Sequence, residues 1–79
     1  MRLDKYLKVS RIIKRRTVAN EACDAGRVIV NGKVARASYD IKVGDIIEIT
    51  FGAREFKAEV TTVAETVKKE EASLMYKII

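Results

Sequence analysis

The dipeptide Asn31-Gly32 constrains the fold of this chain more than any other local feature. It separates the β-prone run Val28-Ile29-Val30 from residues 33–35. A two-residue turn of type I′ needs positive φ at both central positions, and Asn followed by Gly meets this need best. The sequence therefore predicts a β-hairpin over residues 28–35, with Lys33 projecting toward solvent.

Two short helices are predicted before this hairpin. Leu3, Tyr6 and Leu7 recur at helical spacing, which predicts a helix near residues 3–9. Asp4 in its first turn suits the positive end of the helix dipole. The same spacing favours Tyr6 as a core side chain over one that stacks on a base.

The second helix is predicted over residues 18–25, with Thr17 as its N-cap and Gly26 just past its end. Its apolar stripe consists of Val18, Ala19, Ala22 and Cys23. Nothing near Cys23 in the sequence resembles an activating base, which favours a small core residue over a reactive thiol.

Two further strands and a tail complete a predicted α+β fold. Residues 46–51 form a β-prone run, and residues 54–64 alternate between apolar and charged side chains, which indicates an antiparallel pair. Residues 66–79 favour a short C-terminal helix whose apolar side packs back through Leu74, Met75 and Ile78. We divide the chain into a domain of residues 1–64 and a tail of residues 65–79.

Charge is distributed unevenly along the 79 residues, a length that fits one domain. The net charge is +5; residues 1–36 hold ten basic and three acidic side chains, whereas residues 37–79 hold six and eight. A solubilising surface is the simpler explanation, but it does not usually produce such an asymmetry. The excess in the N-terminal half is expected for a surface that faces phosphates.

Several kinds of chemistry are disfavoured by what the sequence lacks. With no histidine and one cysteine, an internal disulfide is impossible, and a structural zinc site or histidine acid–base catalysis is disfavoured. There is no phosphate-loop motif, and the aspartates are explained by helix ends and turns. No apolar run approaches the roughly 20 residues that span a membrane, and no signal peptide is recognised. We expect a non-enzymatic, cytoplasmic monomer without cofactor or metal.

The sequence favours binding to a polyanion. We expect the cations of the two helices, their linker and the hairpin to form one continuous patch, with the RNA-binding residues Arg2, Lys5, Arg11, Lys14, Arg15, Arg16 and Lys33. Neutralising phosphates releases counterions, and arginine adds bidentate hydrogen bonds and stacking on bases. Arg27, beside a helix end, either joins this set or caps helix carbonyls, and both interpretations stay open.

The order of these residues resembles the S4-type RNA-binding domain. The resemblance covers about residues 2–50 and rests on Arg2-Leu3-Asp4-Lys5, Lys14-x-Arg16-Thr17, Gly26-Arg27-Val28, Val30-Asn31-Gly32-Lys33 and Gly44-Asp45. It implies the αL fold, in which two short helices pack on a small, mostly antiparallel sheet. It also implies that Arg2 and Arg16, which match the motif arginines of the family, are the leading RNA contacts.

Among stand-alone members of that family, the chain is most similar to the ribosome-associated quality control protein P (RqcP) family, through its first five residues, Lys14 to Thr17 and Lys68 to Tyr76. The heat-shock protein 15 family is related. The resemblance implies binding to the large ribosomal subunit, through rRNA and peptidyl-tRNA. It also implies support for alanine tailing of stalled chains by an RqcH/NEMF-type tailing protein. The alternatives are a heat-shock-type ribosome recycling or assembly factor and, in another class, a protein-interaction module.

Overall fold

The hairpin forms as the Asn-Gly turn predicts. The computed structural model describes all residues, 1–79, and places β1 (Val28–Val30) antiparallel to β2 (Lys33–Val34), with Val30 opposite Lys33. Asn31 and Gly32 have φ angles of 53° and 83°, the positive values that a type I′ turn requires. The Asn31 side chain also accepts the backbone N–H of Ile46 at 2.9 Å, which ties the turn to the next strand. The predicted hairpin and the exposed Lys33 are confirmed.

The two predicted helices are α1 (Leu3–Val9) and α2 (Arg16–Asp24). The expectation that Thr17 caps α2 is wrong, because the extended residue Arg15 holds the N-cap position and makes no side-chain capping bond. The end of α2 is as predicted. Gly26, at φ 77°, donates its N–H to the carbonyl of Cys23, and Arg27 donates to Ala22. These two bonds form a Schellman motif, which satisfies the last helix carbonyls.

The sheet has the strand order β2-β1-β3-β4-β5 and is antiparallel throughout. Its long pair is β3 (Ile46–Phe51) with β4 (Arg54–Val60), which confirms the predicted antiparallel pair. The prediction that this strand extends to residue 64 is wrong. After Val60 the chain leaves the strand, since the N–H groups of Thr61 and Thr62 both donate to the carbonyl of Met75.

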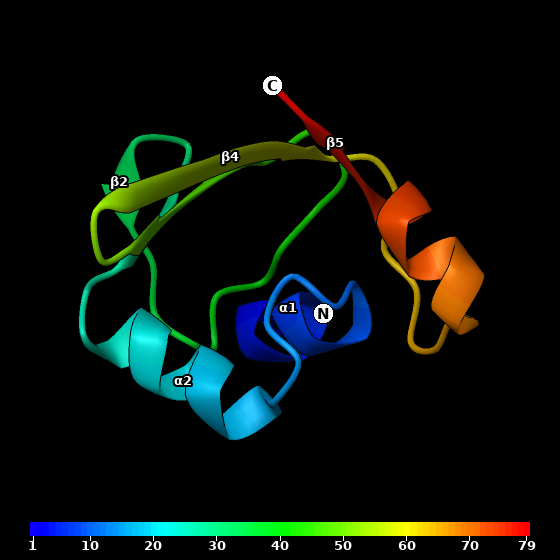
Figure 1. Ribbon diagram of the computed structural model, residues 1–79, viewed down its shortest axis with the longest axis horizontal. Coiled ribbons are helices and arrows are strands. Elements are labelled where there is room, and N and C mark those ends of the chain that lie inside the picture. The colour runs from blue at the N-terminus through cyan, green and yellow to red at the C-terminus, as the bar shows by residue number, and fades with distance from the viewer.

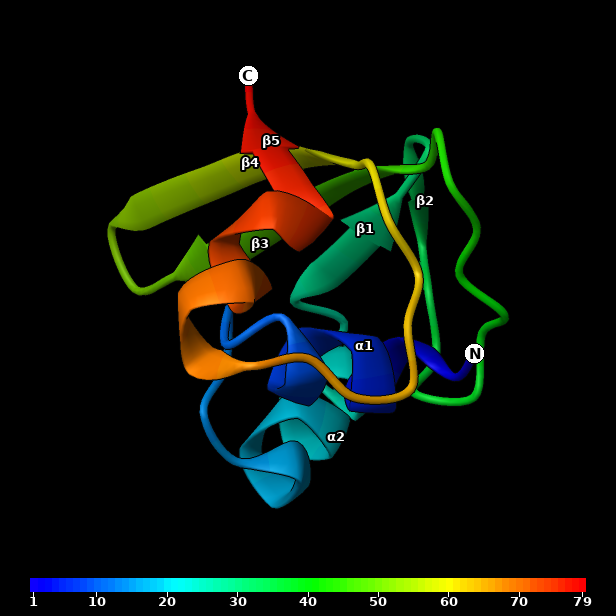
Figure 2. The ribbon, with the colours of Figure 1, turned by 90° about the vertical axis from the view of Figure 1, so that its right-hand side faces the viewer.

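The tail joins the sheet instead of ending as a helix. It comprises a 3-10 helix, η1 (Lys69–Met75), and the strand β5 (Tyr76–Ile78), which pairs with β4. The prediction of a helix over residues 66–79 is confirmed for Lys69–Met75. It is wrong for Tyr76–Ile78, which pairs with the open edge of β4 as a strand. Met75 is buried as predicted, whereas Leu74 and Ile78 are exposed. Residues 61–68, here called the strap, run from β4 across α1 to η1 (Figure 2).

Helices α1 and α2 cover one face of the sheet, and the core lies between the two layers (Figure 1). Tyr6 is fully buried and donates its hydroxyl to the carbonyl of Met75 at 2.7 Å, so the core interpretation of Tyr6 is confirmed. Burial raises the pKa of Tyr6, and the nearby Tyr76 adds to the effect. Cys23 is also a core residue, and burial raises the pKa of its thiol to about 11. None of the helices has the length and apolar character needed to cross a membrane.

Candidate RNA interface

Arg2 and Arg16 are held side by side by one buried carboxylate. Asp4 lies in the first turn of α1, where its side chain is only 3% exposed and faces α2. Arg2 approaches it with Nε at 3.1 Å from Oδ1 and Nη2 at 3.4 Å from Oδ2. Arg16, the first residue of α2, places its Nε 3.4 Å from Oδ2. The two guanidinium groups thus share one anchor while their side chains stay 50% and 47% exposed.

The Asp4 carboxylate is built to remain ionised. Burial alone would raise its pKa, but hydrogen bonds from Arg2, Asn20, Arg16 and the backbone of Lys5 outweigh burial and hold the pKa below its usual value. The Asn20 amide donates at 3.2 Å and the Lys5 N–H at 2.8 Å. A charged acid at this position fixes the direction of both arginine side chains, because arginine presents its donors in a rigid planar fork.

The backbone at Arg2 lies beside the loop that follows the hairpin. Arg2 forms a β-bridge with Asp40, and the next residue, Leu3, donates its N–H to the carbonyl of Tyr39 at 2.8 Å. Tyr39 in turn lines a shallow depression together with Lys33 on β2. The structure therefore brings Arg2 and Arg16 together, while Lys33 is linked to them only through the segment around Tyr39. We call Arg2 and Arg16, with Asp4 beneath them, the arginine surface.

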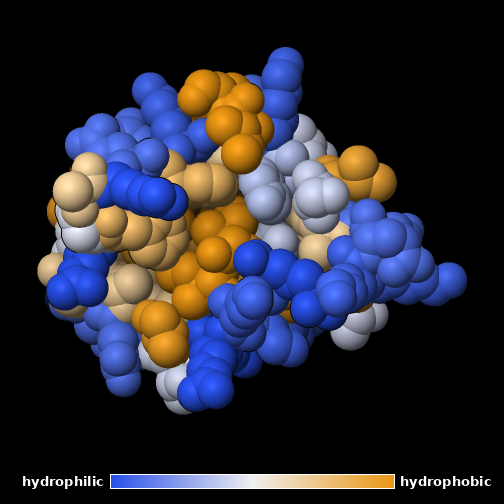
Figure 3. Space-filling model, in the orientation of Figure 1, coloured by the Kyte–Doolittle hydropathy of each residue, from blue (hydrophilic) through white to orange (hydrophobic).

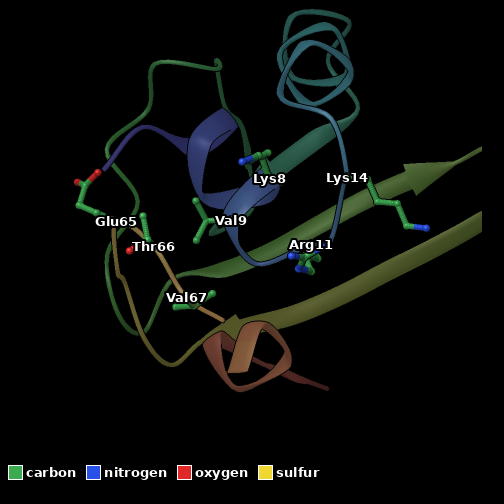
Figure 4. A pocket seen from close by; sticks show the side chains of 7 residues that line it. All are labelled: Lys8, Val9, Arg11, Lys14, Glu65, Thr66 and Val67. Atoms are coloured by element: carbon green, nitrogen blue, oxygen red, sulfur yellow. The ribbon is translucent and has the colours of Figure 1, made fainter. Parts of the chain in front are cut away.

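The remaining predicted cations of α1 and its linker lie toward the strap. Lys5 forms an ion pair with Glu65 of the strap, and no other cation contacts that acid. Lys8, Arg11 and Lys14 line a pocket of about 220 Å³ whose far wall is the strap. Figure 4 shows Lys8 and Arg11 on one side and the strap on the other, with the Lys14 side chain extending away from the strap. Arg15 is exposed and immediately precedes Arg16 at the start of α2.

The interpretation of Arg27 as a side-chain cap of helix carbonyls is wrong, and its membership of the RNA-binding set stays a prediction. Its backbone N–H closes the end of α2, while its guanidinium caps no carbonyl. The side chain lines a groove between α2 and the end of β3, beside the exposed Val18 and Phe51. In Figure 3, hydrophobic side chains fill the space between the sheet and the helices, and hydrophilic side chains surround them.

Sequence reasoning missed the central role of Asp4, which it assigned to the helix dipole alone. The signal was available, because Asp4 lies between Leu3 and Leu7 on the inward half of α1, where a free charge would be costly. It also missed Lys8 and the strap residues Glu65 and Thr66, which lie far from the basic run in the sequence. No group of three or more acidic or cysteine side chains is placed to hold a metal ion.

The family model that matches the chain is described as the S4 domain, and it covers residues 1–47. This match spans both helices, the hairpin and the start of β3. The chain belongs to the S4 domain family. It follows that the predicted αL fold is confirmed, and that the strap and the tail lie outside the part that the family shares.

Individual relatives match this S4 domain chain over nearly its whole length. A protein of Halalkalibacterium halodurans is 56% identical over 99% of this chain and 89% of its own length. A protein of Streptococcus pneumoniae is 57% identical over 100% of this chain and 90% of its own length. Both are named RQC P-site tRNA stabilizing factor. Among solved structures, heat shock protein 15 of Vibrio cholerae, described as trimeric, superimposes with a TM-score of 0.92 at 28% identity, over 100% of this chain and 81% of that one.

Proposed function

We propose that this S4 domain chain is a non-enzymatic, cytoplasmic RNA-binding factor that stabilises a P-site tRNA during ribosome-associated quality control. Relatives that match it over nearly its whole length are named for that role. The observation that carries the proposal is the arginine surface, in which Asp4 anchors Arg2 and Arg16 beside each other. A buried anchor beneath two half-exposed arginines is expected for a surface that binds phosphates.

The mechanism is electrostatic attraction of RNA phosphates by arginine side chains that Asp4 already holds in position. Arg16 contacts Asp4 through Nε, so its two terminal nitrogens stay available for a phosphate. Arg2 uses Nε and one terminal nitrogen on Asp4, which leaves the other one free. Since Asp4 already limits the side-chain freedom of both arginines, less entropy is lost when RNA binds. Such contacts recognise the shape and backbone of structured RNA more than its sequence.

In finer detail, the factor binds the large ribosomal subunit through both rRNA and peptidyl-tRNA. It acts as a monomer and supports alanine tailing of the stalled chain by an RqcH/NEMF-type tailing protein. The cations on both sides of α1 support contact with more than one RNA segment, because the linker carries charge from the strap side to the arginine surface. Lys5 contributes to RNA binding only after it exchanges Glu65 for a phosphate.

The test is co-sedimentation of the purified chain with large ribosomal subunits that carry peptidyl-tRNA. Arg2→Ala and Arg16→Ala should each lower the bound fraction, and both variants should remain folded. Arg54→Ala is the matched control, because Arg54 is an exposed cation without an ion pair at the β3–β4 turn. Equal sedimentation of all three variants with wild type would refute the proposal.

A heat-shock-type recycling or assembly factor is the second candidate, and the close superposition on heat shock protein 15 favours it. The two functions are separated by purifying the tagged chain from cells. Stalled peptidyl-tRNA and the tailing protein should co-purify with a quality-control factor and should be absent from a recycling factor. A protein-interaction module would keep its partner after ribonuclease treatment, whereas an RNA-mediated complex would dissociate.

A further inference from the structure

The pocket between α1 and the strap is a concave site with cationic walls. Lys8 and Arg11 contribute the positive charges, Lys14 lies at the outer edge with its side chain directed away from the strap, and Thr66 lies on the opposite wall. Val9 and Val67 supply its apolar lining (Figure 4). A volume of about 220 Å³ accommodates one phosphate group with bridging water.

The cations of this pocket have no partner within the protein. The ion pairs of the chain join Met1 to Asp40, Arg2 and Arg16 to Asp4, Lys5 to Glu65, and Lys57 to Glu48. None of them involves Lys8, Arg11 or Lys14. Glu65 is the one acid in the lining, and Lys5 neutralises it. The pocket therefore keeps an uncompensated positive charge that favours an anion.

The backbone at Arg11 is a second, independent observation. Arg11 has a φ of 63°, and the only other residue apart from glycine with positive φ is Asn31 in the hairpin turn. This conformation follows the end of α1, where glycine is the usual residue because a Cβ atom adds strain at positive φ. An arginine at a position that favours glycine points to a use for its guanidinium, since outliers of this kind gather at binding sites.

We infer that this pocket is a second phosphate site, which takes a backbone phosphate of the bound RNA away from the arginine surface. Arg11 and Lys8 supply the charge, and Thr66 turns its hydroxyl inward to donate to the phosphate. Glu65 keeps Lys5 out of the site, because the two side chains form an ion pair. This inference rests on the proposed RNA-binding function and assigns a role to the strap, which the family model does not cover.

The central variant is Arg11→Gly, because it removes backbone strain, which favours stability, and also removes a positive charge, which weakens RNA binding. Glycine adopts positive φ without cost, so thermal stability should stay the same or rise. Binding of fluorescently labelled tRNA should weaken roughly tenfold through loss of one charged contact. The slope of log affinity against log salt should fall by about one. Arg11→Lys keeps the charge and should recover much of the affinity.

Two further substitutions test the opposite wall. Thr66→Val keeps the shape of the side chain and removes only its hydroxyl, so tRNA affinity should fall by roughly threefold to tenfold. Glu65→Gln should strengthen tRNA binding, because it frees Lys5 from its ion pair. Glu70→Gln is its matched control, since Glu70 is an exposed acid of η1 without an ion pair and its substitution changes the net charge equally.

Titration with inorganic phosphate, followed by the amide NMR signals of Arg11 and Thr66, separates RNA from a free anion as the ligand. Shifts that saturate with phosphate while Arg11→Gly binds tRNA like wild type would overturn the assignment to RNA. Unchanged tRNA affinity in Arg11→Gly and Thr66→Val, with Arg16→Ala impaired, would refute this site and leave the proposed function standing. If Arg16→Ala is also unimpaired, the proposed function fails as well.

Discussion

The substitution Asp4→Asn removes the negative charge that holds Arg2 and Arg16 side by side. Asparagine has nearly the same size and can still accept the backbone N–H of Lys5. Its amide group, however, would face the donors of Asn20 and both arginines. The change therefore separates the role of the charge from the role of the shape.

The cost to stability follows from the exposure of each contact. The two arginine side chains are about half exposed, so solvent screening limits each ion pair to roughly 0.5 kcal/mol. The bond from Asn20 to the buried carboxylate, together with the mismatch that replaces it, contributes about 1 kcal/mol. We expect a loss of about 2 kcal/mol, which lowers the melting temperature of a domain of this size by about 8–16 °C.

The effect on RNA binding is the more discriminating readout. Asp4→Asn adds one unit to a net charge of +5, so a purely electrostatic account predicts tighter tRNA binding. Loss of the shared anchor predicts weaker binding, because Arg2 and Arg16 become free to adopt other rotamers. Asp24→Asn, at the exposed end of α2, is the control with the same charge change. The preorganisation argument is refuted if folded Asp4→Asn binds tRNA as tightly as Asp24→Asn.

Three further perturbations test the fold beneath the site. The pKa of Asp4 is lower in the folded than in the unfolded protein, so its charge stabilises the fold above the unfolded value of 3.8. This stabilisation is lost as the pH falls through the folded pKa. Urea midpoints measured across a pH series should therefore decline more steeply below about pH 4 in wild type than in Asp4→Asn. Tyr6→Phe removes one of the three hydrogen bonds that the carbonyl of Met75 accepts and should cost about 1 kcal/mol in urea unfolding, with tRNA affinity unchanged. Cys23 is buried with a pKa of about 11, so its thiol should resist alkylation at pH 8 until urea unfolds the chain.

Local chemistry made much of the fold predictable. The Asn31-Gly32 turn, the glycine that ends α2 and the alternation along β4 each act over a few residues, and each produces the expected element. The start of α2 was not predictable from capping preference, because Arg15 occupies the N-cap position and Arg16 is drawn to Asp4 instead. Tertiary pairing outweighed the preference of Thr17 for a cap.

The tail was less predictable because its structure depends on distant partners. Its last residues become a strand only because β4 offers an unpaired edge, and Met75 is fixed by Tyr6, which lies near the opposite end of the chain. For the same reason, the sequence indicated which cations could bind RNA but not which of them lie beside Asp4 and which beside the strap. The pairing of Lys5 with Glu65 joins residues that no short-range pattern connects.

The most direct measurement is site-specific photo-crosslinking in cells, with a benzophenone amino acid at position 17 or at position 55. Thr17 is exposed beside Arg16 and Asp4, whereas Glu55 lies on the face of β4 that points away from the helices. Position 17 should yield covalent adducts with tRNA and large-subunit rRNA, and position 55 should yield few or none. Equal RNA adducts from both positions, or adducts from position 55 alone, would contradict the assignment of RNA binding to the arginine surface.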